Sequence, residues 1–172
     1  MPVFLDRILT FNLIFSTLIF YVAARIYLLP RIKELAPEAI LVPILLLHSL
    51  RHLGLMFLTR GAVYAGMPPP FAYPAAIGDF LAAVLAFTAI PAVQKNWQAA
   101  RTQVWIFNVV GTLDLVLAIT LATIYQAAVF MGPAYWIPAF WVPALLVTHY
   151  IAFVVLAGRR STSDEIENTK RR

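Results

Sequence analysis

Six ionisable side chains lie in stretches that are otherwise apolar enough to cross a bilayer. They are His48, Arg51, His52, Asp79, Asp114 and His149. The first three stand in the stretch HSLRH at positions i, i+3 and i+4, which share one face of an α-helix. Charged groups inside membrane spans are energetically costly, usually face the protein interior, and often serve a function. We therefore predict an intramembrane polar cluster in which HSLRH forms the basic wall.

The composition of the chain predicts an integral membrane protein around this cluster. Of the 172 residues, 62% are hydrophobic and 12% are charged, against roughly 45–50% and about 25% in soluble domains. The formal net charge of +5 does not indicate a nucleic-acid partner, because the basic residues gather at the ends of the apolar segments. The absence of cysteine excludes disulfides, thiolate catalysis, zinc–thiolate sites and covalently attached c-type haem.

Five apolar stretches are long enough to cross a bilayer as α-helices, which takes about 20 residues each. They cover residues 8–29, 38–59, 71–93, 103–130 and 138–157. We therefore expect an all-α integral membrane protein with a single five-helix transmembrane domain over residues 1–158. Residues 159–172 are highly charged and have little apolar surface to bury, so we expect a disordered cytoplasmic tail there.

Lysine and arginine positions predict the orientation of the spans. Ten of the thirteen basic residues lie around the first link, around the loop from Lys95 to Arg101, and in the tail. The opposite side carries Arg7 and Arg60. Because cytoplasmic segments carry the excess of basic residues, we expect the N-terminus outside and the C-terminus in the cytoplasm. The expected location is the cell membrane, with a bacterial inner membrane favoured.

The positions of the six ionisable groups along their spans predict how they pair. At a rise of ~1.5 Å per residue, they form a midplane tier of His48, Asp114 and His149 and a tier roughly 5 Å further out of Arg51, His52 and Asp79. We expect Asp79 to pair with Arg51, with His52 as an additional partner, and Asp114 to pair with His149 or His48. Small residues surround Asp79 at helical spacing, so its side chain should face protein.

The charges of this cluster do not balance. Arginine keeps its proton under essentially any condition, so Arg51 faces two aspartates and one negative charge remains when the histidines are neutral. Because a buried net charge is unfavourable, the cluster should hold one more proton, on a histidine or on an aspartate. A proton that competing groups share is what a proton relay requires, although a structural network can look the same. Asn108 is expected on a different helix face from Asp114.

The first functional hypothesis is proton-linked movement of an ion or small solute through this cluster. The alternative is binding of b-type haem or a metal ion, in a membrane redox role, by His48, His52 and His149. His48 and His52 have the one-turn spacing of paired ligands, and His149 lies at a similar depth to His48 in another span. The sequence alone does not identify the metal.

A third hypothesis is a non-catalytic subunit of a larger membrane complex, or a homo-oligomer, which suits the rows of small residues in the third span. Nucleotide-binding, zinc-protease and serine-hydrolase motifs do not occur in the chain. Arg51 and the histidines could bind an anionic lipid or quinone headgroup, but no nucleophile–base pair supports catalysis, and an enzyme is not favoured. The expected partner is the lipid bilayer, with no nucleic acid.

Overall fold

The computed structural model describes the backbone of residues 2–170 and the side chains of residues 7–158. Within these residues the regular secondary structure is helical, apart from one isolated bridge between Arg60 and Val63. Five helical segments in this described part are long and apolar enough to cross a membrane: Arg7–Arg31, Pro37–Leu58, Pro69–Gln94, Ala100–Ile124 and Gly132–Gly158. The predicted number of apolar helical segments long enough to cross a membrane is therefore confirmed.

Five α-helices and five shorter helical segments follow one another along the chain. The α-helices are α1 (Pro2–Tyr27), α2 (Pro37–Ser49), α3 (Pro69–Gln94), α4 (Ala100–Ile124) and α5 (Val142–Lys170). The 3-10 segments are η1 (Leu29–Arg31), η2 (Leu50–Leu58), η3 (Ala127–Phe130) and η4 (Gly132–Tyr135), and η5 (Ile137–Trp141) is a π-helix. The tail predicted at residues 159–172 has no described side chains, and its disorder stays a prediction.

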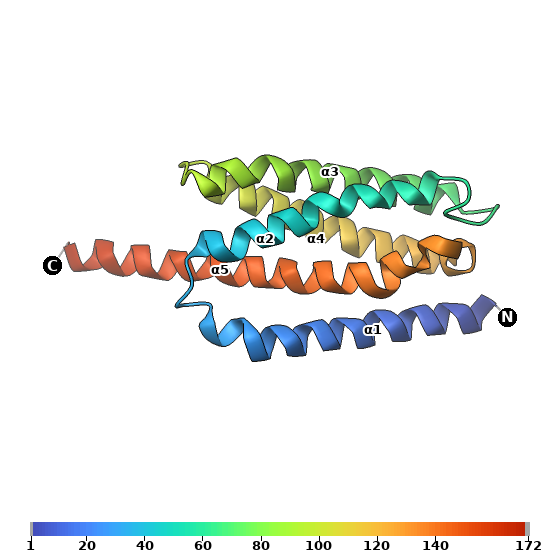
Figure 1. Ribbon diagram of the computed structural model, residues 1–172, viewed down its shortest axis with the longest axis horizontal. Coiled ribbons are helices and arrows are strands. Elements are labelled where there is room, and N and C mark those ends of the chain that lie inside the picture. The colour runs from blue at the N-terminus through green and yellow to red at the C-terminus, as the bar shows by residue number, and fades with distance from the viewer. Residues whose placement is uncertain (1, 171–172) are drawn as a thin grey trace.

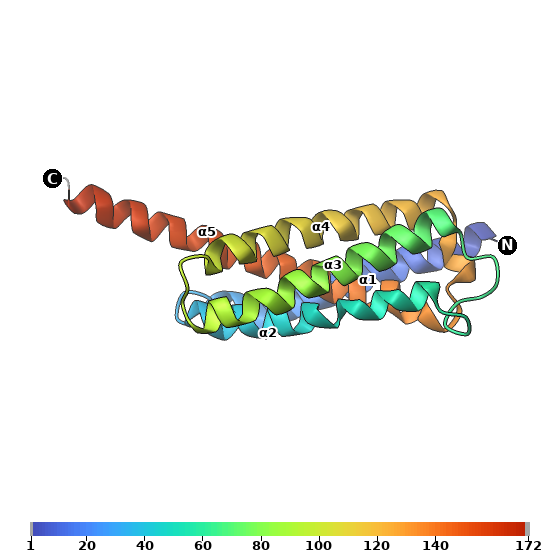
Figure 2. The ribbon, with the colours of Figure 1, turned by 90° about the horizontal axis from the view of Figure 1, so that it is seen from above.

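The helices lie side by side in an elongated bundle (Figures 1 and 2). Figure 1 shows the N-terminus, the link after η2 and the segments η3 to η5 at one end of the bundle. The links after α1 and after α3, and the C-terminal part of α5, lie at the other end. The helix α1 packs along α5 at one edge, whereas α2, α3, α4 and α5 surround the interior.

The second span differs from the continuous α-helix predicted over residues 38–59. The helix α2 ends at Ser49 and continues as η2, a 3-10 run of nine residues. Such runs rarely exceed 3–4 residues, and one inside a span often marks a hinge or strain. Gly54, in the middle of η2, packs so closely against α3 that an added Cβ would overlap the side chain of Asp79.

The predicted fourth span was also too long at its C-terminal end, because α4 ends at Ile124 and not near residue 130. Gln126 then has a left-handed backbone, with φ 49°, which breaks the helix. The fifth segment begins with the 3-10 helix η4 and the π-helix η5 before it becomes α5. Pro138 and Pro143 both lack the backbone N–H that a regular α-helix would use there, which favours an irregular start.

Two apolar clusters fill the interior, and polar residues lie between them. The first cluster includes Leu45, Ala86, Phe107 and Ile151, and the second includes Phe57, Ala75, Leu115 and Leu145. Each of the four inner spans therefore passes from one apolar cluster to the other. The polar residues of these spans lie at the crossing, which fixes the site near the centre of the bundle.

Candidate functional site

Arg51 is the centre of the site. Its side chain is 0% exposed, and its guanidinium donates hydrogen bonds to groups on three other helices. Nε donates to Asp79 Oδ1 on α3 at 2.8 Å, and Nη2 donates to Asp114 Oδ2 on α4 at 2.5 Å. Nη1 lies 3.1 Å from the carbonyl oxygen of Gly111 and 3.3 Å from Nε2 of His149 on α5. One guanidinium thus ties η2 to α3, α4 and α5.

The two carboxylates are less enclosed than the arginine that they share. The side chain of Asp79 is 12% exposed and that of Asp114 is 11% exposed. Asp79 therefore faces protein, as predicted. Asp79 also lines a cavity of about 30 Å³, which Phe57 of η2, Leu115 of α4 and Ile137 of η5 help to enclose. The carboxyl group of Asp79 thus has a small space beside it.

Three glycines inside helical segments make room for the cluster. A Cβ at Gly78 would overlap the carboxylate of Asp114, as one at Gly54 would overlap that of Asp79. A Cβ at Gly111 would lie 2.7 Å from Cε1 of His149 and 2.9 Å from Nη1 of Arg51. Because contacts under 3 Å are too close for a methyl group, each glycine is required for the observed positions of these side chains.

His149 takes part in the network as a neutral imidazole. Its Nε2 faces an N–H of Arg51, which can only donate, so Nε2 acts as the acceptor. The proton then belongs on Nδ1, which donates to Oδ1 of Asn108 at 2.7 Å. Asn108 donates in return through Nδ2 to the carbonyl oxygen of His149, at 3.2 Å. Asn108 is 0% exposed, and these two bonds join it to the network, a role that its expected position on a different helix face from Asp114 does not predict.

His48 lies beside His149 but is less well satisfied. The two ring centroids are 4.2 Å apart. His48 Nε2 lies 2.9 Å from Oγ1 of Thr148, and that hydroxyl donates to the carbonyl oxygen of Ala144. Nε2–H of His48 is therefore the donor to Thr148, and Nδ1 is left as a buried acceptor without a partner. Buried polar atoms usually find a hydrogen bond, so this exception marks His48 as unusual.

His52 is not part of the cluster. Its side chain is exposed, and Nδ1 lies 3.1 Å from the carbonyl oxygen of Ser49 in the same span. The prediction that His48 and His52 share a face assumed α-helical geometry. From Leu50 the span is a 3-10 helix, which has fewer residues per turn than an α-helix. Four residues therefore make up to about one and a third turns, and side chains four positions apart no longer lie on the same face.

The imidazoles do not form the haem or metal site that their spacing suggested. A porphyrin cannot fit between His48 and His149 with ring centroids 4.2 Å apart. The side chain of His52 is exposed and bonds only within its own span, to the carbonyl oxygen of Ser49. Among the described residues, no group of three or more histidine, aspartate or glutamate side chains could hold a metal ion.

The pairing also differs from the prediction for Asp114. Asp79 pairs with Arg51, as predicted, but Asp114 pairs with the same arginine and not with His149 or His48. The reason is the shape of the guanidinium, which carries five donors in a planar fork and can serve two carboxylates at once. Its Nη1 edge then turns to His149, so the arginine separates the carboxylates from the imidazoles.

Residues 8–157 of the chain match one family along their length, from the first span to the end of the fifth. The match includes every residue of the polar network described above. No curated protein and no solved structure matches the chain. Because the matched segment covers most of the sequence, the chain belongs to the family described as Domain of unknown function (DUF8737).

Proposed function

We propose that this protein couples proton binding at Asp79 and Asp114 to the movement of an ion or small solute across a membrane. It would do so as a multi-pass protein of the cell membrane, with the N-terminus outside and the C-terminus in the cytoplasm. The observation that carries the proposal is the sharing of one buried guanidinium by two carboxylates. One positive charge against two negative charges leaves a negative charge to be balanced.

A bound proton is the balance that the hydrogen-bond network favours. Both histidines have the hydrogen bonds of neutral rings, and Arg51 keeps its own proton. The additional proton therefore belongs on one of the two carboxylates, each of which is about a tenth exposed. Two carboxyl groups that share one guanidinium and compete for one proton give the cluster two protonation states.

Arg51 also favours coupled movement over a continuous proton wire. An arginine cannot lose its proton in a protein, and this one stands between the carboxylates and His149. Protonation of one aspartate would weaken its bond to the guanidinium and leave the other bond intact. Because Asp79 belongs to α3 and Asp114 to α4, the position of the proton would decide which helix η2 holds more tightly.

The positions of the histidines give no comparable support to the alternative function, binding of haem or a metal ion in a redox role. The expected association with itself or with a larger membrane complex stays a prediction. The helix α1, which packs on α5 at the edge of the bundle, belongs to the least buried of the five apolar segments and is therefore the most available for it.

Proton flux into liposomes tests the proposal. Purified protein would be reconstituted into vesicles that contain a pH-sensitive dye, and a pH gradient would then be imposed. Wild type should dissipate the gradient faster than empty vesicles, and the Asp114→Asn/His149→Ala variant should lose this activity. His52→Ala is the matched control, since its side chain is exposed outside the cluster, and it should behave as wild type. Identical fluxes from wild type and the double variant would refute the proposal.

A further inference from the structure

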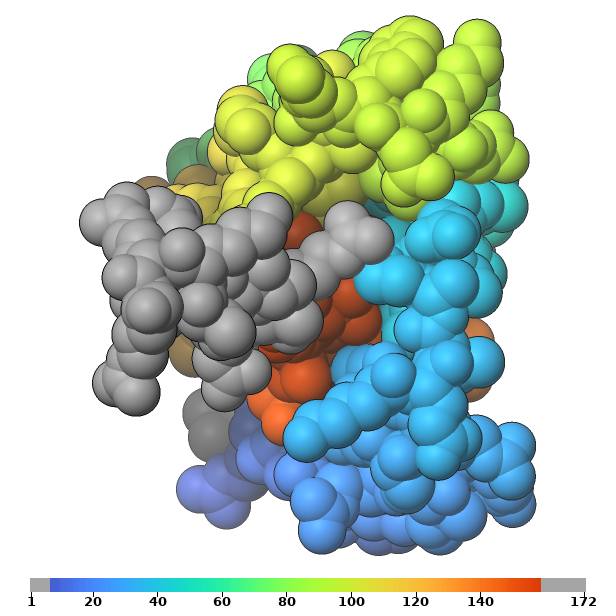
Figure 3. Space-filling model, turned by 90° about the vertical axis from the view of Figure 1, so that its left-hand side faces the viewer, coloured from blue at the N-terminus to red at the C-terminus, as the bar shows by residue number. Residues whose placement is uncertain are grey.

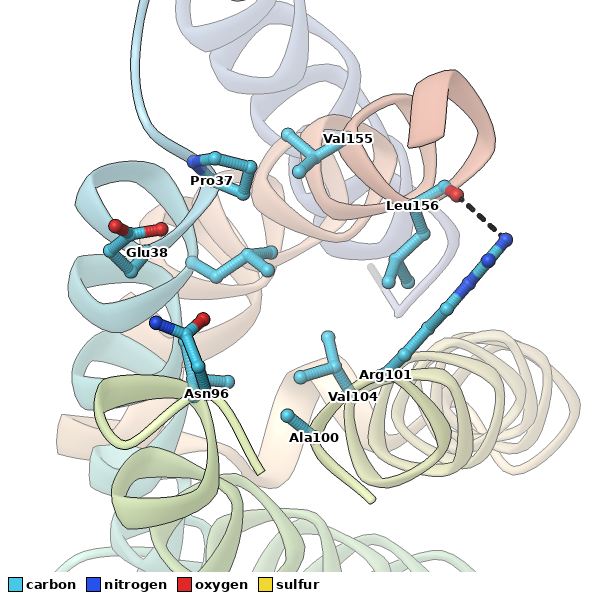
Figure 4. A pocket seen from close by; sticks show the side chains of 10 residues that line it. Pro37, Glu38, Asn96, Ala100, Arg101, Val104, Val155 and Leu156 are labelled. Carbon is cyan, nitrogen blue, oxygen red and sulfur yellow. Dashed lines mark hydrogen bonds between the residues drawn. The ribbon is translucent and has the colours of Figure 1, made fainter. Parts of the chain in front are cut away.

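Two cavities of about 30 Å³ each lie at opposite ends of the polar cluster. Each has room for one or two water molecules. The first is the cavity that Asp79 lines. The second lies between the first turns of α2 and α4 and the later part of α5, and its polar lining is Glu38, Asn96 and Arg101 (Figure 4). Glu38 and Arg101 lie on opposite walls, and Arg101 donates to the carbonyl oxygen of Leu156 at 3.4 Å.

Figure 3 views the molecule from the end to which this second cavity belongs. The links before α2 and after α3 stand on either side of α5 there. Both links carry basic residues that the charge distribution assigns to the cytoplasmic side. The two cavities would therefore belong to opposite faces of the membrane.

One layer of apolar side chains separates the second cavity from the histidine pair. Leu45, Phe107 and Ala152 belong to this layer, since all three are 0% exposed and are members of the same apolar cluster. The next turn outward carries Leu41 and Val104, which already line the cavity. The layer is therefore about one helical turn thick, since Leu45 precedes His48 by three residues at a rise of ~1.5 Å per residue.

Phe107 is in direct contact with the polar cluster. Its ring centroid lies 4.9 Å from that of His48 and 5.1 Å from that of His149. An aromatic side chain at this position excludes water from both imidazoles on the side of the second cavity. On the opposite side no such layer stands between the first cavity and Asp79, because Asp79 itself forms part of the cavity wall.

We infer that the layer of Leu45, Phe107 and Ala152 is a closed gate, and that the described conformation is one of two access states. In this state the cluster is reached from the cavity beside Asp79. In the second state the gate opens to the cavity beside Glu38 and Arg101. The inference rests on the proposed function, because alternating access requires that proton occupancy of the aspartates be coupled to the gate.

Two further observations suit a chain with two states. The walls of the first cavity include residues of η2 and η5, which are a 3-10 run and a π-helix and not regular α-helix. Such segments recur at hinges and functional sites. His48, next to the gate, has the buried Nδ1 without a partner. Water that entered through an open gate would supply the missing hydrogen bond.

The natural absence of cysteine makes the gate directly testable. A single Ala152→Cys substitution places a small thiol in the gate, and Val104→Cys places one in the cavity beyond it. The rate of modification by a membrane-impermeant thiol reagent is measured at fixed pH, in otherwise wild-type protein and together with Asp114→Asn or Asp79→Asn. Ala134→Cys is the matched control, since Ala134 is also 0% exposed but belongs to the other apolar cluster.

We expect Val104→Cys to react at least tenfold faster than Ala152→Cys in the wild-type background. Neutralising an aspartate should then raise the rate at position 152 at least tenfold and leave position 134 unchanged. Equal rates at 104 and 152, or a rate at 152 that neither neutralising variant changes, would overturn the gate. Proton flux in vesicles with an unresponsive position 152 would leave the proposed function standing without the gate. A response at position 152 without proton flux would leave the gate standing without the proposed function.

Discussion

Replacement of Arg51 by methionine should destabilise the protein strongly, because it leaves the largely buried carboxyl groups of Asp79 and Asp114 without their shared partner. The side chain is 0% exposed and bonded to Asp79, Asp114, Gly111 and His149. Removing one partner of a buried ion pair costs about 3–5 kcal/mol. For a chain of this size, about 1 kcal/mol corresponds to about 2–4 °C, so Tm should fall by about 6–20 °C.

The assay is thermal unfolding in a mild detergent, with the triple variant Arg51→Met/Asp79→Asn/Asp114→Asn as the decisive comparison. If the unpaired carboxylates cause the loss, the triple variant should recover most of it, since replacing a whole buried ion network by neutral groups is often close to neutral. Arg60→Met, at an exposed arginine, is the control. A single variant no less stable than this control, or a triple variant as unstable as the single one, would refute the reasoning.

Two further substitutions probe the packing around the network, and both can be measured by the same unfolding assay. Gly78→Ala should lower stability by about 1–3 kcal/mol, because the added methyl group overlaps Asp114. Gly158→Ala is the control: nothing lies near its added Cβ, so it should be neutral or stabilising by up to about 1 kcal/mol. Equal effects of the two substitutions would contradict the packing argument. Asn108→Leu should lower stability by about 1–3 kcal/mol, because it leaves both Nδ1–H and the carbonyl oxygen of His149 without their observed partner. An unchanged Tm would mean that Asn108 does not hold the His149 ring in place.

The sequence predicted the five spans because each contains a long apolar run between proline- or charge-rich links. It also predicted that Arg51, Asp79, Asp114, His48 and His149 lie near one another, since unpaired charges in apolar spans must meet. The clustering of these side chains could therefore be predicted from the energetic cost of unpaired charges in apolar spans, without any recognisable motif.

The parts that could not be predicted depend on local helix geometry. His52 was assigned to the cluster because α-helical spacing was assumed, and the change to a 3-10 helix at Leu50 turns it outward. The role of Asn108 depends on the register of α4 against α5, which single-span periodicity does not determine. The glycines at 54 and 78 were informative only once the side chains opposite them were known. A glycine close to a buried charge in a neighbouring span is a signal that could have been sought.

Infrared spectroscopy of the carboxyl groups tests the central claim most directly. A protonated carboxyl group and a carboxylate absorb at different frequencies, so the extra proton of the cluster should give its own band. Wild-type protein in lipid at neutral pH should show a protonated-carboxyl band that is absent from the Asp79→Asn/Asp114→Asn variant. His52→Ala should retain it. A wild-type spectrum without this band, or the same band in the double variant, would contradict the claim that these two aspartates share an exchangeable proton.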